Sequence, residues 1–401
     1  MAIQNTSNLS NAITTRYTQR YQRAAAVKRL YDQLAVPIGA PQYQLEQRRG
    51  MGSTYTFNFA SDMNPGTTAI SESADITPQV LTDATSTVTP TSRGEAIKWS
   101  ELLDLEAYTD FIALRAEKVG ENAMETIETL AISAALGGSL VSRTGARNGL
   151  DAGTTADRWT EAAMWEASAL TQALRCPPYM DKGRSMFFAI GHPDAYYDLF
   201  HGGNVVTAAT YQNLGILLNG ELGEIANFKL IISPWAKVFG SAGAANTTTL
   251  GADTLSAAAT ALDKTMSVTT GTNIGSGRLI TVGTEETSTT FYPTNERVKL
   301  ISGTTTAVIV GSGANGGLRF DHASGASVLN NDSVYPIAYG APGSLVKIFA
   351  NEVGAFGKLV GPKEDGVANQ WQSLAWKFYG NYGRVGENYI VRGEYTSSLD
   401  A

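Results

Sequence analysis

The sequence predicts an α+β protein with a projecting β-hairpin and a small inserted β-domain. Three observations support this prediction. Apolar residues recur at helical spacing over residues 109–136. Helical and strand patterns alternate between residues 160 and 235. From residue 240 to 342 the chain becomes rich in Thr, Ser and Gly, with short strand patterns between turns.

Composition limits the class of protein. The 401 residues carry 43% hydrophobic and 17% charged side chains, which is enough apolar material for a folded core and excludes a disordered chain. The net charge of −7 gives no basic excess, so a dedicated nucleic-acid reader is not expected. The start of the chain shows no signal-peptide pattern, and no stretch is apolar enough to span a bilayer. We therefore expect a protein made and used in the cytoplasm.

Residues 1–42 predict an N-terminal arm and a short helix, which Pro37 and Pro41 end. The arm is basic, with no acidic residue before Asp32. Two interpretations stay open: a solvated helix face, or an arm that binds neighbouring copies or faces nucleic acid. The basic residues of the arm are Arg16, Arg20, Arg23, Lys28 and Arg29.

Residues 43–98 predict an extended hairpin. Tyr55, Phe57 and Phe59 alternate with polar residues, which is the period of a strand. A stretch rich in Thr, Ser and Asp follows from residue 61 to 91, and residues 96–99 form a second strand pattern. A loop of this length is uncommon inside a compact domain unless it is functional. Because so polar a segment cannot bury itself, we expect it to find a partner surface.

Residues 99–239 carry the clearest helix and the alternating segment. The helix at 109–136 has an apolar stripe opposite charged residues and stops at Gly137 and Gly138. A second helix over 160–174 ends before Pro177, and a third begins with Pro193 at its first position. Apolar runs at 185–190 and 228–232 predict buried strands beside these helices. We expect the boundary between the two units at about residue 156.

Residues 240–342 predict an inserted β-rich domain, and residues 343–401 return to the preceding sheets. None of the six tryptophans lies in the insert. Strand patterns occur at 266–269, 278–282, 298–301, 307–310 and 334–339. The aromatic, β-prone segment 373–392 closes the chain.

The sequence offers little support for catalysis. His192, His201 and His322 have no second ligand at a metal-binding spacing, and no nucleophile elbow accompanies them. We expect His192 to cap or pack, and His201 to lie against the end of a helix. Cys176 has no paired base and is expected to be structural. No catalytic, cofactor-binding or metal site is predicted.

Several short motifs resemble one family when taken in order. They are RGMGSTY at 49–55, ISESADITP at 70–78, GEAIKWSELL at 94–103, AIGHPD at 189–194 and NGELGEI at 219–225. Their order resembles that of the major capsid proteins of tailed phages, with the Hong Kong 97-type fold, and is most similar to the branch found in short-tailed phages of the N-four type. Relatives often carry Thr-Glu-Gly near the second motif, where this chain has Ser73 in place of the Gly. The insert resembles nothing in the family.

The resemblance implies a division of labour. Residues 43–98 would be the extended loop that lies over the adjacent subunit. Residues 99–156 would form the peripheral domain around a spine helix at 109–136, and residues 157–239 the axial domain. The insert would decorate the shell or bridge capsomers. The implied subunit-interface residues are Arg48, Arg49, Tyr55, Phe57, Glu72 and Asp75.

The same resemblance implies a shell of hexamers and pentamers that encloses double-stranded DNA. The basic arm would make weak contact with that DNA. Portal, scaffold and decoration proteins are the other expected partners, and no membrane is expected. An encapsulin-like nanocompartment stays open as an alternative, as does another tail or surface protein of a virion. An enzyme is the third alternative. Particle size and contents separate the first alternative from a phage head.

Overall fold

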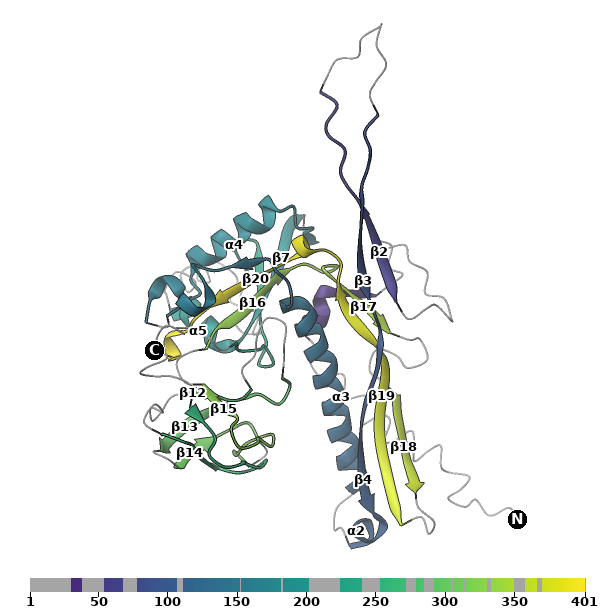
Figure 1. Ribbon diagram of the computed structural model, residues 1–401, viewed down its shortest axis with the longest axis vertical. Coiled ribbons are helices and arrows are strands. Elements are labelled where there is room, and N and C mark those ends of the chain that lie inside the picture. Colours follow the sequence, from purple (N-terminus) through teal and green to yellow (C-terminus); the bar gives the residue numbers. More distant parts are fainter. Residues whose placement is uncertain are drawn as a thin grey trace, which may run out of the picture.

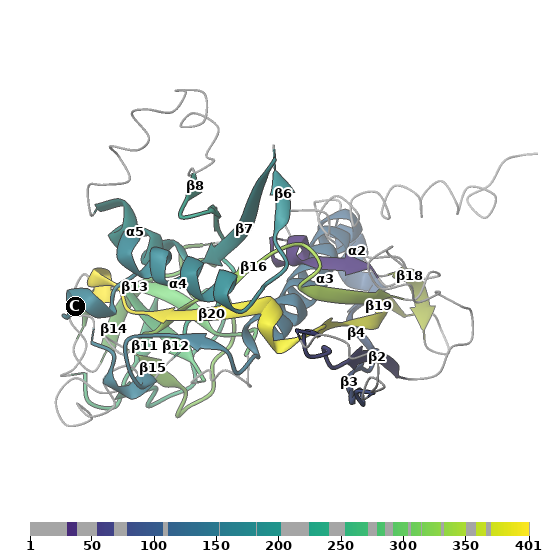
Figure 2. The same ribbon diagram turned by 90° about the horizontal axis from the view of Figure 1, so that it is seen from above.

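The computed structural model describes residues 30–37, 54–67, 78–106, 111–151, 153–181, 183–201, 224–239, 253–271, 279–284, 292–303, 306–313, 315–329, 333–349, 358–365 and 370–400. The described part is elongated: a two-stranded hairpin projects at one end, and the ends of the longest strands lie at the other (Figure 1). From above, the lobe with α4 (Glu161–Ala173) and α5 (Pro193–His201) lies on one side (Figure 2). The strands β4 (Thr91–Ser100), β18 (Lys358–Asp365) and β19 (Trp371–Arg384) lie on the other (Figure 2).

A long helix and a five-stranded sheet form the first lobe. Helix α3 (Phe111–Leu136) is the helix that the apolar stripe predicts. Its Ala123 and Ile127 pack in one buried cluster with Trp376 and Phe378 of the sheet. The strands are β1 (Ala35–Pro37), β17 (Leu345–Phe349), β19 (Trp371–Arg384), β18 (Lys358–Asp365) and β4 (Thr91–Ser100), with β4 on β19. A short helix, α2 (Glu101–Glu106), follows β4.

The hairpin differs from the sequence expectation in its second strand. Strand β2 (Tyr55–Ala60) pairs antiparallel with β3 (Asp83–Val88) and not with the strand at 96–99. That strand is part of β4, which pairs along its whole length with β19. Residues 83–88 look like a loop in the sequence because a solvated two-stranded ribbon has little buried face to impose alternation. The projecting unit is therefore β2–β3, and β4 belongs to the first lobe.

A seven-stranded sheet forms the second lobe. Its order is β5 (Val141–Ser142), β20 (Ile390–Tyr395), β16 (Tyr335–Gly340), β7 (Arg184–Gly191), β9 (Phe228–Ile232) and β8 (Glu224–Ile225), with β6 (Tyr179–Asp181) on β7. Helices α4 (Glu161–Ala173) and α5 (Pro193–His201) accompany it. Trp159 and Tyr339 are buried in its core, where the Trp159 indole donates to the Tyr339 hydroxyl at 2.8 Å. The Thr160 hydroxyl caps α4 by accepting from the Ala163 N–H at 3.4 Å.

The insert forms a separate six-stranded sheet. Its order is β10 (Asp253–Thr254), β15 (Ser327–Leu329), β12 (Leu279–Gly283), β13 (Glu296–Gly303), β14 (Thr306–Val310) and β11 (Thr265–Ser267). The predicted boundary at residue 342 is wrong, because β16 lies between β20 and β7 and all six of its residues are buried. The strand expected at 334–339 therefore belongs to the second lobe, and the insert ends before it.

A buried ionic cluster joins the two lobes. The Glu394 carboxylate accepts hydrogen bonds from Arg143 at 2.7 Å, from Arg392 at 2.9 Å and from Arg147. Arg392 also donates to the carbonyl oxygens of Leu136 and Gly138 at the end of α3, the latter at 2.9 Å. Strand β20 is thereby tied to the carboxyl end of the long helix. The remaining short helices are 3₁₀ turns at Tyr31–Leu34, Arg147–Gly149, Thr155–Asp157, Glu387–Tyr389 and Ser398–Asp400.

Candidate assembly surfaces

The base of the hairpin is fixed to its own chain. Phe57 and Val88 are buried with Val346, Ile348 and Val385 in one apolar cluster. Phe57, expected from the sequence to contact another subunit, thus contacts its own chain and does not belong to the exposed surface. Val88 lies against Gly383 of β19, where a Cβ would come within 2.0 Å of a Val88 methyl carbon. Gly383 therefore permits the close approach of Val88 to β19 at the base of the hairpin.

Beyond its base the hairpin leaves the body. The two arms stay together past the end of the strands, because the Ser61 N–H donates to the Thr82 carbonyl at 2.8 Å. Farther out, the Asn64 N–H donates to the Gln79 side-chain oxygen at 2.8 Å, and the Gln79 amide donates back at 3.2 Å. All described residues from 60 to 67 and from 78 to 85 are exposed, and none belongs to an apolar cluster. These bonds hold an extended shape that no other described part of the chain covers (Figure 1).

The projecting arms carry exposed apolar side chains. Val80 is 90% exposed, Met63 62% and Leu81 47%. Single apolar residues on a surface are common, but these lie on one thin ribbon that has no core of its own. Transfer of such side chains out of water is favourable by roughly 1.5–3 kcal/mol for each one fully buried. The ribbon is therefore suited to bury its tip on another molecule.

The opposite end of the molecule has a second apolar surface. In α2, Leu102 is 62% exposed and Leu105 is 76% exposed, and Leu103 lies between them. Trp371, at the start of β19, is 44% exposed. The Glu101 N–H donates to the Gln370 carbonyl at 2.9 Å, which joins the start of α2 to the end of the loop before β19. The two ends of the elongated body thus both present apolar groups to solvent.

The sequence identified only part of these surfaces. Tyr55 is half-buried at the base of the hairpin, and the proposal that it contacts another subunit stays a prediction. Arg48, Arg49, Glu72 and Asp75 lie outside the described residues, as does the basic arm of Arg16, Arg20, Arg23, Lys28 and Arg29. Met63, Val80 and Leu81 were missed, although an apolar residue within a polar loop is a signal that the sequence offers.

The histidines and the cysteine have structural surroundings. The His192 ring nitrogen Nδ1 accepts the Asp194 N–H at 3.2 Å, and burial lowers the pKa of His192 to about 4. His201 stacks on Tyr197 with ring centres 5.4 Å apart. The Cys176 thiol donates to the Tyr389 carbonyl at 3.0 Å, and burial raises its pKa to about 12. His322 lies 2.9 Å from the Glu296 carboxylate.

The described residues show neither a metal-binding cluster nor a membrane-spanning helix. They contain no group of three or more His, Cys, Asp and Glu side chains arranged to hold a metal ion. None of the helices described is both long enough and apolar enough to cross a bilayer.

The arrangement of a projecting hairpin, a long helix on a five-stranded sheet and a mixed seven-stranded lobe is the Hong Kong 97-type capsid fold, as the sequence resemblance implied. The capsid of Ralstonia phage GP4 shares this fold, with a TM-score of 0.51 and 10% identity over 86% of this chain and 84% of that chain. Weaker likenesses are to the capsid of Cyanophage P-SCSP1u, with a TM-score of 0.47, 10% identity and coverage of 86% and 84%. The structure of Mycobacterium phage Che8 gives 0.46, 7% identity and coverage of 91% and 90%. No family model matches the sequence, and no curated protein matches it.

Proposed function

We propose that this chain is a major capsid protein that assembles into the icosahedral head shell of a tailed phage around double-stranded DNA. The single observation that carries the proposal is the uncovered hairpin on a Hong Kong 97-type body. A ribbon fixed at its base by Phe57 and Val88 and exposed beyond it is suited to contact between copies. The fold shared with the GP4 capsid supports the same function.

The physical basis is repeated burial between identical subunits. A stable protein interface typically buries on the order of 1,600 Å² in total. A thin hairpin offers both faces and both strand edges to a neighbour, so it adds contact area at little cost in chain length. Val80, Leu81 and Met63 supply the apolar part of that area. Heterologous contacts of this kind propagate from subunit to subunit and close when the geometry allows.

The proposal extends to partners and location. Hexamers and pentamers of the chain would form the shell, with portal, scaffold and decoration proteins as further partners. The basic arm, from Arg16 to Arg29, would make weak non-specific contact with packaged DNA. Assembly would take place in the host cytoplasm and the product would be part of the virion, in the branch of short-tailed N-four-type phages. The chain would have a structural role and no enzymatic one.

Electron microscopy of the purified protein tests the proposal. The chain is expressed alone and again with the other head genes of the same genome, and particles are separated by sedimentation. We expect closed icosahedral shells that contain DNA when the packaging proteins are present. A soluble monomer in both preparations would contradict the proposal. Shells that contain only host enzymes would instead identify a protein nanocompartment.

A further inference from the structure

The inserted sheet has a core of its own. Its buried cluster, from Leu255 to Val328, contains no residue of either lobe. The clusters of the two lobes contain no residue of the inserted sheet. The contacts described between the insert and the body include ion pairs, cation–π contacts and hydrogen bonds, among them the bond that the Lys237 ammonium donates to the Tyr292 carbonyl at 3.0 Å. Because apolar burial within the insert does not depend on the body, the sheet is able to change its orientation without losing its own core.

One polar contact lies where the chain enters and leaves the insert. Phe239 and Val334 exchange backbone hydrogen bonds at 2.8 Å in both directions. Arg297 of β13 lies beside this crossing and donates to Ser333 at 3.2 Å and to the Tyr335 hydroxyl. It also pairs with Asp194 of α5 at 3.0 Å. These contacts fix the point about which the insert is attached.

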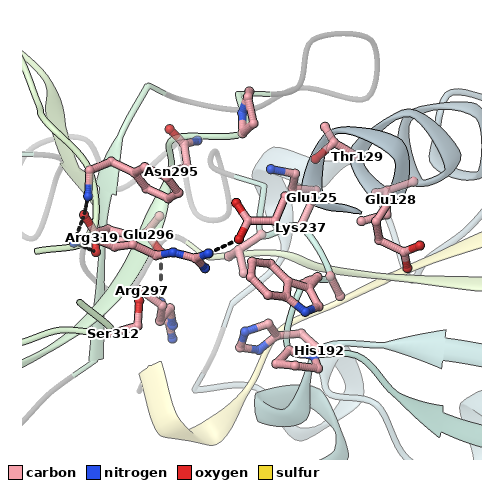
Figure 3. A pocket seen from close by; sticks show the side chains of 18 residues that line it. Glu125, Glu128, Thr129, His192, Lys237, Asn295, Glu296, Arg297, Ser312 and Arg319 are labelled. Atoms are coloured by element: carbon pink, nitrogen blue, oxygen red, sulfur yellow. Dashed lines mark hydrogen bonds and ion pairs between the residues drawn. The ribbon is translucent and has the colours of Figure 1, made fainter. Parts of the chain in front are cut away.

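A second polar contact lies away from the crossing. Arg319, in the segment between β14 and β15, forms an ion pair with Glu125 of α3 (Figure 3). Its guanidinium also lies 4.6 Å from the centre of the Trp235 ring. The Glu296 carboxylate accepts the backbone N–H groups of Arg319 at 2.8 Å and of Phe320 at 3.1 Å. Glu296 of the insert therefore holds the backbone of Arg319 and Phe320 in place, and the Arg319 side chain contacts α3.

Two cavities that are open to solvent are lined by Glu125 of this ion pair. A cavity of about 190 Å³ is lined by Glu125, Thr129, Trp235 and Arg319, among others. Another of about 550 Å³ is lined by Glu125, Val119, Pro293 and Phe320, among others. Arg319 and Glu125 thus bridge the insert and α3 beside a cavity that Trp376 of β19 also lines.

We propose that the insert is a hinged module, with its pivot at Phe239 and Val334, and that the Arg319–Glu125 pair is the latch that fixes its orientation on α3. The side chains of Arg319 and Glu125 are 28% and 15% exposed, so the pair is largely desolvated and regains hydration when it separates, whereas an apolar joint does not. Opening of the latch would free the insert from α3 and leave both cores and the Arg297–Asp194 pair intact. This device would exist in the isolated subunit and does not depend on the shell function.

Spin-label distance measurements on the full chain test the latch. Labels are placed at Leu114→Cys on α3 and Ile301→Cys on β13, because both side chains are about half exposed at 51%. Cys176→Ser removes the native thiol. We expect one narrow distance distribution in the parent protein. Glu125→Gln and Arg319→Gln should each add a second, longer distance.

Two matched variants make the result decisive. Glu117→Gln removes the same charge from an exposed position of α3 and should leave the distribution unchanged. The charge swap Glu125→Arg with Arg319→Glu should restore the narrow distribution, which also covers the case in which a single variant folds poorly. The latch is overturned if Glu125→Gln and Arg319→Gln leave the distribution narrow. A broad distribution in the parent protein would overturn it equally.

Discussion

Phe239 and Val334 hold the two ends of the inserted segment together, each donating its N–H to the carbonyl of the other at 2.8 Å. The chain therefore leaves the second lobe and returns to it at one point. Phe239 itself is fully buried in the core of the body. The two ends of the body on either side of the insert are thus hydrogen-bonded to each other at this crossing.

Excision of residues 241–332 with a short Gly-Ser linker should leave a folded body. The crossing brings the cut ends together, and no cluster of the body contains a residue of the insert. The far-ultraviolet circular dichroism spectrum should keep the signal of α3, α4 and α5, with a cooperative thermal transition. A non-cooperative transition would show that the body needs the insert.

The matched control extends the same excision through residue 340. That deletion removes β16, which lies between β20 and β7 and is wholly buried. Loss of a central strand leaves both neighbours with unpaired backbone groups, so we expect an insoluble or unfolded product. Equal behaviour of the two deletions would mean that the boundary before β16 is misplaced.

Val80→Asp should abolish shell formation and leave the subunit folded. Val80 is 90% exposed, so the free energy of unfolding of the monomer should change by no more than about 0.5 kcal/mol. A charge buried at a contact between copies would instead oppose assembly. Thr67→Asp, on the other exposed arm, adds the same charge at a polar position. Sedimentation and electron microscopy compare the two, and normal shells from Val80→Asp would remove Val80 from the interface.

Gly383→Ala should destabilise the packing of the hairpin base against β19. The new Cβ would meet a Val88 methyl carbon at 2.0 Å, so strand or side chain must move. Overpacking of this kind typically costs about 1–3 kcal/mol of stability. Gly66→Ala is the control, since a Cβ there has no neighbour within 4 Å. Hydrogen exchange should rise in β2 and β3 for Gly383→Ala alone, and unchanged exchange would argue against the close packing.

Glu394→Gln should destabilise the protein at neutral pH and much less in acid. Burial alone would raise the pKa of Glu394, but hydrogen bonds and positive charge from Arg147, with Arg392 and Arg143, outweigh it and lower that pKa. A carboxylate with a lowered pKa stabilises the fold above its unfolded pKa, and this stabilisation is lost as the pH falls through the folded value. Removing one partner of a buried ion pair costs about 3–5 kcal/mol.

Chemical denaturation of the parent and of Glu394→Gln at pH 7 and at several values below pH 4.5, the ordinary pKa of the group, measures this difference. The gap in the free energy of unfolding should narrow as the parent carboxylate becomes protonated. A gap that stays constant with pH would show that Glu394 does not act as a charge. A parent that is less stable than the variant at pH 7 would contradict the proposed role of the cluster.

Local pattern predicted the helices and the buried strands well. The apolar stripe at 109–136 predicted α3, and Pro193 begins α5 as expected. These elements could be predicted because an element that is buried on one side has apolar residues at a regular spacing in the sequence. The change of composition at residue 240 also indicated the insert, since a sheet with its own small core needs no large aromatic residues.

The sequence did not predict which strands pair when they lie far apart in the chain. Strand β16 has the low charge of the insert that precedes it, and only its neighbours β20 and β7 show that it belongs to the second lobe. The partner of β4 lies in the last part of the chain. Glu394 is likewise 251 residues from Arg143 and 247 residues from Arg147, so no spacing rule predicts that they form one cluster. Such contacts depend on topology and not on local propensity.

The central claim is that the hairpin is buried on another copy of the chain. A cryo-electron-microscopy map of assembled particles tests it directly at residues 61–67 and 78–82. We predict that Met63, Val80 and Leu81 contact an adjacent subunit and lose most of their exposure. Particles in which these arms fold onto their own body, or remain in solvent, would contradict the account.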